Sequence, residues 1–136
     1  GFYRACEALG IRIDDTMVRE SRYHDAKRCA QITKELMELP DRPTCVIFPD
    51  DYSYIGGMNV IREMGLRIPE DMSFMSIDGL VVSDFIEPPL STMALDKAAM
   101  GANAMQLLYA IMNGRPYEPV NLMKTHIVRR QTVRRL

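Results

Sequence analysis

The chain has 136 residues, 47% of them hydrophobic and 26% charged, and a formal net charge of −1. These values are typical of one folded domain or part of one, and they exclude a multidomain enzyme, a disordered chain and a general polyanion binder. The charge is unevenly divided, since residues 1–96 hold 10 basic and 17 acidic side chains, whereas residues 97–136 hold 7 and 1.

The first quarter of the chain reads as a helix followed by an irregular segment. Apolar residues at helical spacing predict a helix up to Leu9, with Gly10 ending it. Because no capping residue precedes this helix, we expect Gly1 to be a cut point rather than a native terminus. Short strands are predicted around residues 12–13 and 17–18.

The rest of the chain alternates between helices and short apolar runs that are typical of buried strands. Such alternation predicts an α/β fold with a parallel sheet. The predicted order is helix 25–39, strand 44–48, helix 54–64, strand 72–77, loop 80–89, strand 91–94, helix 97–113 and strand 123–133.

Three carboxylates follow two of the predicted strands: Asp50 and Asp51 follow the first, and Asp78 follows the second. Parallel sheets bind ligands beyond the carboxyl ends of their strands. Carboxylates there can hold Mg²⁺, take part in phosphoryl transfer, or accept hydrogen bonds from the hydroxyls of a sugar. We expect Asp50 and Asp78 to contact a ligand and Asp51 to cap the following helix.

Other chemical motifs are sparse. Tyr23 lies just ahead of a predicted helix and is interpreted either as a partly buried tyrosine or as a ring that stacks on a sugar. The pair Gly56 and Gly57 lies within a helix and indicates close packing rather than phosphate binding. The three cysteines form no C-x-x-C pair, which favours a reducing compartment, and no stretch approaches the roughly 20 apolar residues of a membrane-spanning helix.

Several segments closely resemble the effector-binding domain of LacI/GalR-type transcriptional regulators. They cover nearly the whole chain in the order and spacing of that family. The matching segments are 46–51 (VIFPDD), 62–71 (REMGLRIPED), 75–78 (MSID), 88–92 (PPLST), 114–116 (GRP) and 128–131 (VRRQ).

The resemblance implies a periplasmic-binding-protein-like (type I) fold of two α/β lobes, with a small effector such as a sugar in the cleft between them. A helix-turn-helix headpiece, absent from this chain, would bind operator DNA, and the protein would be a cytoplasmic homodimer without cofactor or enzymatic activity. By this comparison the fold is incomplete: residues 1–96 and 120–136 form the carboxyl-terminal lobe, and residues 97–119 form a crossover helix that belongs to the other lobe.

The resemblance also implies roles for individual residues. Tyr23, Asp50 and Asp78 match effector contacts, and Lys97 lies near the cleft, where the family often has an apolar or aromatic residue. The expected dimer contacts, which could instead pack within the lobe, are Tyr54, Met58, Phe85 and Ile86.

Two alternatives stay open. A sugar-binding protein of an ABC transporter shares the fold, although the unpaired cysteines and the segment 67–73 (RIPEDMS) favour the regulator. A Mg²⁺-dependent phosphatase would use Asp50 and Asp78. We also expect the isolated chain to associate, because the apolar face of helix 97–113 would otherwise stay uncovered.

Overall fold

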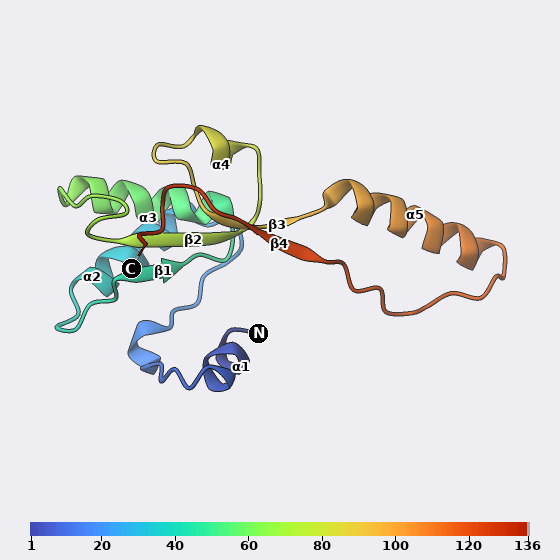
Figure 1. Cartoon of the computed structure of the whole chain (residues 1–136), viewed down its shortest axis with the longest axis horizontal. Helices are drawn as coiled ribbons and strands as arrows, with labels where there is room; N and C mark the ends of the chain where they lie inside the picture. The colour runs from blue at the N-terminus through green and yellow to red at the C-terminus, as the bar shows by residue number, and fades with distance from the viewer. Residues whose placement is uncertain (136) are drawn as a thin grey trace.

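Four strands form one sheet in the computed structural model, which describes residues 1–135. β1 (Cys45–Ile47), β2 (Ser73–Asp78) and β3 (Thr92–Leu95) are parallel neighbours in that order. β4 (Thr125–Val128) pairs with β3 in the antiparallel direction (Figure 1). The predicted α/β fold is confirmed. The last strand reverses direction because the chain leaves the lobe through a long helix and returns alongside β3.

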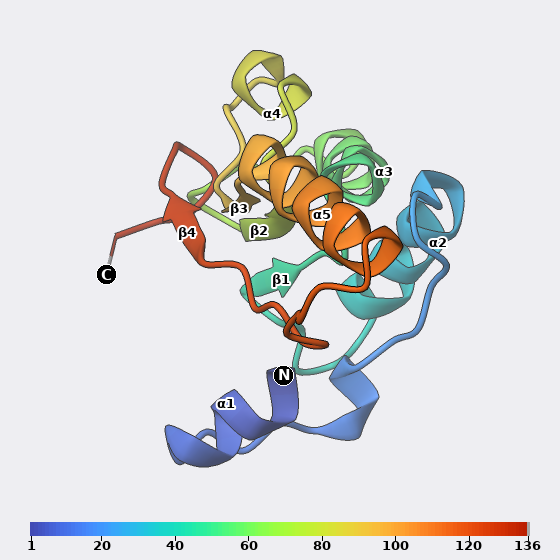
Figure 2. The same ribbon diagram turned by 90° about the vertical axis from the view of Figure 1, so that its right-hand side faces the viewer.

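Helices α2 (Ala26–Met37) and α3 (Asp51–Glu63) pack against each other on one face of the sheet (Figure 2). Each begins at an aspartate whose carboxylate accepts a hydrogen bond from a free backbone N–H in the first turn, the usual role of an N-cap residue. Buried side chains from both helices and from β2 and its flanking segments form the core: Cys29, Ile32, Leu36, Met37, Phe48, Tyr54, Met58, Ile61, Met72, Phe74 and Leu90.

Two glycines allow α2 and α3 to approach closely. A Cβ atom on Gly56 would lie 1.9 Å from the carbonyl oxygen of Ala26, and one on Gly57 would lie 2.2 Å from the ring of Phe48. Real Cβ atoms do not come so near to other heavy atoms, since protein interiors are already close-packed. The packing interpretation of this glycine pair is confirmed.

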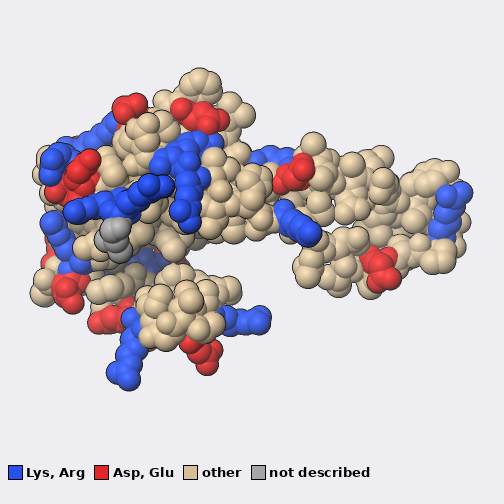
Figure 3. All heavy atoms as spheres, viewed as in Figure 1, with Lys and Arg blue, Asp and Glu red and all other residues tan. Residues whose placement is uncertain are grey.

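The longest helix, α5 (Lys97–Met112), projects away from the sheet (Figure 1), and none of its residues is buried. Helix α5 and the segment that returns from it to β4 form a projecting arm. Most side chains of α5 are uncharged, so this arm shows few charged groups (Figure 3). The large exposed apolar side chains of α5 are Met100, Met105, Leu108, Tyr109, Ile111 and Met112.

The structure corrects several predicted elements. Helix α1 (Phe2–Ala8) is present, but residues 12–13 and 17–18 form no strands. A 3₁₀ turn, η1 (Asp15–Met17), takes their place, because the Asp14 carboxylate accepts a hydrogen bond from the Thr16 N–H at 2.8 Å. The predicted loop 80–89 contains a short helix, α4 (Val82–Phe85).

The basic end of the chain folds back against acidic neighbours. Arg130 forms an ion pair with Asp84 at 2.6 Å and donates to the carbonyl of Leu90 at 2.6 Å. The side chain of Thr132 donates to the carbonyl of Phe74. These contacts hold the terminal segment on the lobe, so part of the positive charge of residues 97–136 is offset by the acidic part of the chain.

Candidate functional site

The carboxyl end of β2 brings together two residues that are far apart in the sequence, Tyr23 and Asp78. The Tyr23 hydroxyl donates a hydrogen bond to Oδ2 of Asp78. This hydrogen bond, with smaller contributions from burial and from the charge of Asp78, raises the pKa of Tyr23 to about 12. Tyr23 is 57% exposed and Asp78 is 8% exposed. Together they present an aromatic surface and a hydrogen-bond acceptor, two components of a ligand site.

The backbone at this strand end has an unusual conformation. Asp78 has a φ of 113°, which non-glycine residues rarely adopt, and Gly79 follows with a φ of 63°. A Cβ atom on Gly79 would lie 2.5 Å from the Cβ of Ala94 on β3. Strained residues of this kind cost of order 1–3 kcal/mol and cluster at functional sites. The strain turns the chain sharply after β2 and fixes where the Asp78 carboxylate lies.

Asp50 is fully buried and caps α3. Its carboxylate accepts hydrogen bonds from Ser53 N–H at 2.8 Å, the Ser53 hydroxyl at 2.6 Å and His24 N–H at 2.9 Å. Burial acts to raise the pKa of Asp50, but these three donors together hold the pKa below its ordinary value. A direct ligand contact by Asp50 stays a prediction, because in this conformation the carboxylate is engaged by the protein.

Asp51, the residue that the sequence analysis assigned to the helix cap, has a different structural role. Its buried carboxylate accepts hydrogen bonds from the Leu80 N–H at 2.6 Å and from three hydroxyls. The hydroxyl donors are those of Ser76 on β2, Ser83 on α4 (2.7 Å) and Thr92 on β3 (2.8 Å). The N-cap residue of α3 is Asp50 instead, because its carboxylate accepts a hydrogen bond from the N–H of Ser53, three residues further along the chain.

Three rings lie in a row beside the site. The rings of Tyr23 and His24 stack with centroids 4.4 Å apart, and the His24 ring meets Tyr52 edge-on at 5.1 Å. His24, which the sequence analysis did not assign to the site, has a φ of 59° that aims its N–H at Asp50. No sequence pattern predicts this, because the contact depends on the fold of the segment ahead of α2.

Lys97 also reaches the end of β2. Its Nζ donates hydrogen bonds to the backbone carbonyls of Asp78 and Gly79, the latter at 3.1 Å. Three of the four predicted ligand residues, Tyr23, Asp78 and Lys97, therefore meet at one strand end. Asp50 lies behind them and reaches the row of rings through His24.

The predicted dimer contacts divide into two groups. Tyr54 and Met58 are 0% and 6% exposed and belong to the core, which favours the alternative that they pack within the lobe. A dimer contact by these two residues stays a prediction. Ile86 is half-buried against the same core. Only Phe85, which is 81% exposed on α4, is freely available to a second protomer.

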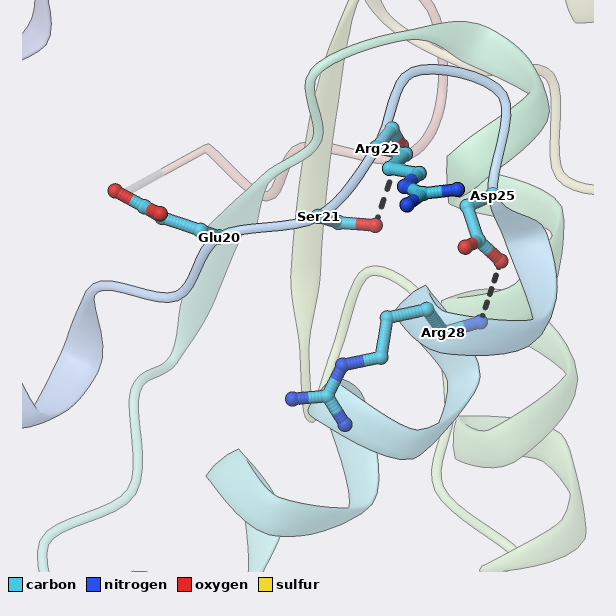
Figure 4. A pocket seen from close by; sticks show the side chains of 5 residues that line it. All are labelled: Glu20, Ser21, Arg22, Asp25 and Arg28. Carbon is cyan, nitrogen blue, oxygen red and sulfur yellow. Dashed lines mark hydrogen bonds between the residues drawn. The ribbon is translucent and has the colours of Figure 1, made fainter.

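A shallow hollow of about 430 Å³ lies on the segment that leads into α2 (Figure 4). All its lining residues are polar or charged types, whereas most small-molecule sites are lined mainly by hydrophobic residues. One of them, Asp25, caps α2 by accepting from the Arg28 N–H at 2.9 Å. The hollow does not include Asp78 or Lys97. The lining residues are Glu20, Ser21, Arg22, Asp25 and Arg28.

Within residues 1–135, no three His, Cys, Asp or Glu side chains come together as a group that could hold a metal ion. No helix in the same range is long and apolar enough to cross a membrane.

Comparison with known proteins gives a consistent result. The profile of the periplasmic binding protein-like domain matches residues 1–133. The HTH-type transcriptional repressor PurR of Vibrio atlanticus (strain LGP32) is 31% identical over 137 aligned positions, which cover all of this chain and 41% of PurR. The chain therefore spans about two fifths of the length of this curated relative.

Solved structures of regulators share the fold. The transcriptional regulator CelR in complex with cellobiose superimposes with a TM-score of 0.86 at 27% identity, over 96% of this chain and 40% of CelR. A LacI family transcriptional regulator from Bifidobacterium animalis subsp. lactis gives a TM-score of 0.86 at 25% identity, over 97% of this chain and 47% of the regulator. The described lobe thus corresponds to part of a longer fold in each of these proteins.

Proposed function

The chain belongs to the periplasmic-binding-protein-like domain family, and from this premise we propose that it is the effector-sensing part of a DNA-binding transcriptional regulator of the LacI/GalR type. The observation that carries the proposal is the Tyr23–Asp78 pair at the carboxyl end of β2, the place where open α/β sheets bind their ligands. The similarity to transcriptional repressors and regulators supports the same conclusion and favours a non-enzymatic role.

The proposed ligand is a small molecule rich in hydroxyl groups, such as a sugar. Asp78 has one carboxylate oxygen engaged by Tyr23, so the other can accept from a ligand hydroxyl. The exposed ring of Tyr23 can cover an apolar face of the ligand. The cellobiose complex of CelR, which superimposes over nearly the whole chain, is in line with a sugar.

Operator DNA binding, a cytoplasmic location and a homodimer complete the proposal for the whole protein. Phe85 on α4 is the exposed apolar side chain among the expected dimer contacts. The ABC-transporter alternative receives less support, because the relatives and solved structures described above are transcriptional regulators. The phosphatase alternative would need Asp50 at the reacting atoms, whereas Asp50 is fully buried in the cap of α3.

Calorimetric titration of sugars, nucleosides and purine bases tests the proposal. At least one of these compounds is expected to bind. Asp78→Ala is expected to weaken that binding at least about tenfold, because a hydrogen bond to a charged group is worth about 1.5–3 kcal/mol. Asp41→Ala serves as the matched control, since Asp41 is an exposed aspartate in the loop after α2.

Two results would contradict the proposal. Ligand binding that survives Asp78→Ala unchanged would place the site elsewhere on the lobe. A helix-turn-helix segment missing from the longer protein, with a secretion signal in its place, would favour the transporter protein instead.

A further inference from the structure

Lys97 is exposed, and hydrogen bonds hold its ammonium at the end of β2. Its ammonium donates to the carbonyls of Asp78 and Gly79, and these two contacts use two of its three N–H donors. A lysine side chain ordinarily loses considerable rotamer entropy when it is fixed. Here the turn after β2, where Asp78 and Gly79 both have positive φ, places two carbonyl groups within hydrogen-bond distance of one ammonium.

The positive charge of Lys97 is not neutralised by an ion pair. Over the described range 1–135, no carboxylate oxygen lies within 4.0 Å of its Nζ. The other two strand-end carboxylates are fully buried in this conformation: Asp50 accepts from three protein donors and Asp51 from four. The accessible charged groups at this strand end are therefore the Asp78 carboxylate and the Lys97 ammonium.

We propose that Lys97 determines ligand specificity and makes the site selective for a polyhydroxy acid, whose hydroxyls donate to Asp78 while its acid oxygen accepts from Lys97. This inference rests on the proposed function, because it assumes that the ligand binds at the end of β2. Lys97 hydrogen-bonds to the backbone of the same residue whose carboxylate suits hydroxyl groups, so one ligand can contact both side chains. Charge-assisted hydrogen bonds of this kind are about twice as strong as neutral ones.

A carboxylate and a phosphate ester offer the same oxyanion chemistry to Lys97, and lysine binds both as a compact point charge. Comparing three forms of one sugar shows whether the site prefers a carboxylate or a phosphate ester. The three forms are the neutral sugar, its uronic or aldonic acid, and its phosphate monoester. Glucose, galactose and ribose provide three such sets.

The test is an NMR titration of the ¹⁵N-labelled chain, with the amide resonances of Gly79 and Leu80 and the ammonium resonance of Lys97 as reporters. At least one acid is expected to bind about tenfold tighter than its neutral parent. Lys97→Met keeps the length of the side chain and removes the charge, and it is expected to bring that ratio to about one.

Lys34→Met is the matched control. Lys34 forms a long ion pair with Glu63 at 3.9 Å. Glu63 is the last residue of α3, about 18 Å along the helix axis from Asp51 at its start, given about 1.5 Å per residue. Lys34 therefore lies far from the proposed ligand site. This variant changes the net charge equally and is expected to keep the preference for the acid. Circular dichroism of both variants checks that they are folded.

Three outcomes would overturn the inference. The first is that no acid in the three sets shifts the reporters more than its neutral parent. The second is a preference for the acid that persists in Lys97→Met. The third is that acetate or inorganic phosphate alone shifts the reporters as strongly as the sugar acid.

The same titrations distinguish a failure of the Lys97 proposal from a failure of the proposed sensing function. Neutral sugars that bind in an Asp78-dependent way without any preference for the acid would refute the role of Lys97 and leave the sensing function intact. Binding that is independent of Asp78 in every case would refute both.

Discussion

The Tyr23 hydroxyl donates a hydrogen bond to Asp78 across 55 positions of the chain, and it ties the segment ahead of α2 to the end of β2. The hydrogen bond favours the protonated phenol and raises the pKa of Tyr23 to about 12. Because the folded-state pKa lies above the ordinary value of 10.0, this contribution to stability is complete below about pH 10 and is lost as the pH rises through about 12.

Asp78→Asn is expected to lower the pKa of Tyr23 toward 10, since the amide oxygen accepts a weaker hydrogen bond from the phenol than the carboxylate does and no longer repels the phenolate. An NMR titration of the Tyr23 ring carbon measures this pKa directly. Tyr117, an exposed tyrosine beyond α5, provides an internal reference resonance. An unchanged Tyr23 titration in Asp78→Asn would show that the hydrogen bond does not form in solution.

Asp51 is expected to be the most sensitive carboxylate of the lobe. Asp51→Asn keeps the shape of the side chain but replaces one of its two acceptor oxygens with an NH₂ donor. Some of the four buried donors that face the carboxylate then lose their acceptor. A buried donor that loses its acceptor costs about 1–3 kcal/mol. Urea denaturation measures the loss, and Asp41→Asn on the exposed loop after α2 should change the unfolding free energy by less than about 0.5 kcal/mol.

A loss below about 1 kcal/mol in Asp51→Asn would mean that the serine and threonine hydroxyls find other acceptors. The network would then not be what joins α3 to β2, β3 and α4.

Two glycines in helices are expected to respond in opposite directions to alanine. Gly56→Ala forces a Cβ to 1.9 Å from the Ala26 carbonyl oxygen, so α2 and α3 must separate, at a cost of at least about 2 kcal/mol. Gly101→Ala on α5 meets no atom within 4 Å and should stabilise that helix by about 0.5–1 kcal/mol.

Thermal unfolding followed by circular dichroism compares these two variants with the parent chain. Equal effects of the two substitutions would contradict the close approach of α2 and α3 at Gly56.

Tyr54→Phe is expected to leave the stability of the lobe unchanged or to raise it by up to about 1 kcal/mol. The Tyr54 side chain is fully buried among Phe48 and Phe74, and its hydroxyl has no hydrogen-bond partner among the described residues. A buried polar group without a partner costs about 1–3 kcal/mol, so its removal relieves that cost. A loss of more than about 1 kcal/mol in urea denaturation would show that the hydroxyl is satisfied in solution.

The isolated chain is expected to self-associate through α5, whose apolar side chains are uncovered along the projecting arm (Figure 1). Leu108→Lys combined with Ile111→Lys should shift the chain toward the monomer in light scattering. Leu122→Lys is the control, because Leu122 is 91% exposed but lies outside the helix. A compact monomer at high concentration in the parent chain would contradict this expectation.

Local patterns predicted much of the fold. The apolar stripe of α2, the proline-bounded run of β1 and the glycine after α3 depend on neighbours a few residues apart, and the corresponding elements are present. The irregular segment before α2 was mispredicted as short strands, because strand formation requires a partner edge that sequence periodicity alone does not supply.

The candidate site, like the fold, was predicted in part from the sequence and decided in part by the tertiary structure. The sequence alone determined that carboxylates follow the strands and pointed to Tyr23, Asp50 and Asp78 as ligand residues, and the family resemblance added Lys97. Only the tertiary structure decided how each carboxylate is engaged. Asp50 accepts from Ser53 and His24, and Asp51 accepts from Leu80 and from hydroxyls on β2, β3 and α4. Asp78 accepts from the Tyr23 hydroxyl at one carboxylate oxygen, and its backbone carbonyl accepts from Lys97. The physical reason is that the engagement of a carboxylate depends on which donors the folded chain brings to it, and those donors come from segments up to 55 positions away.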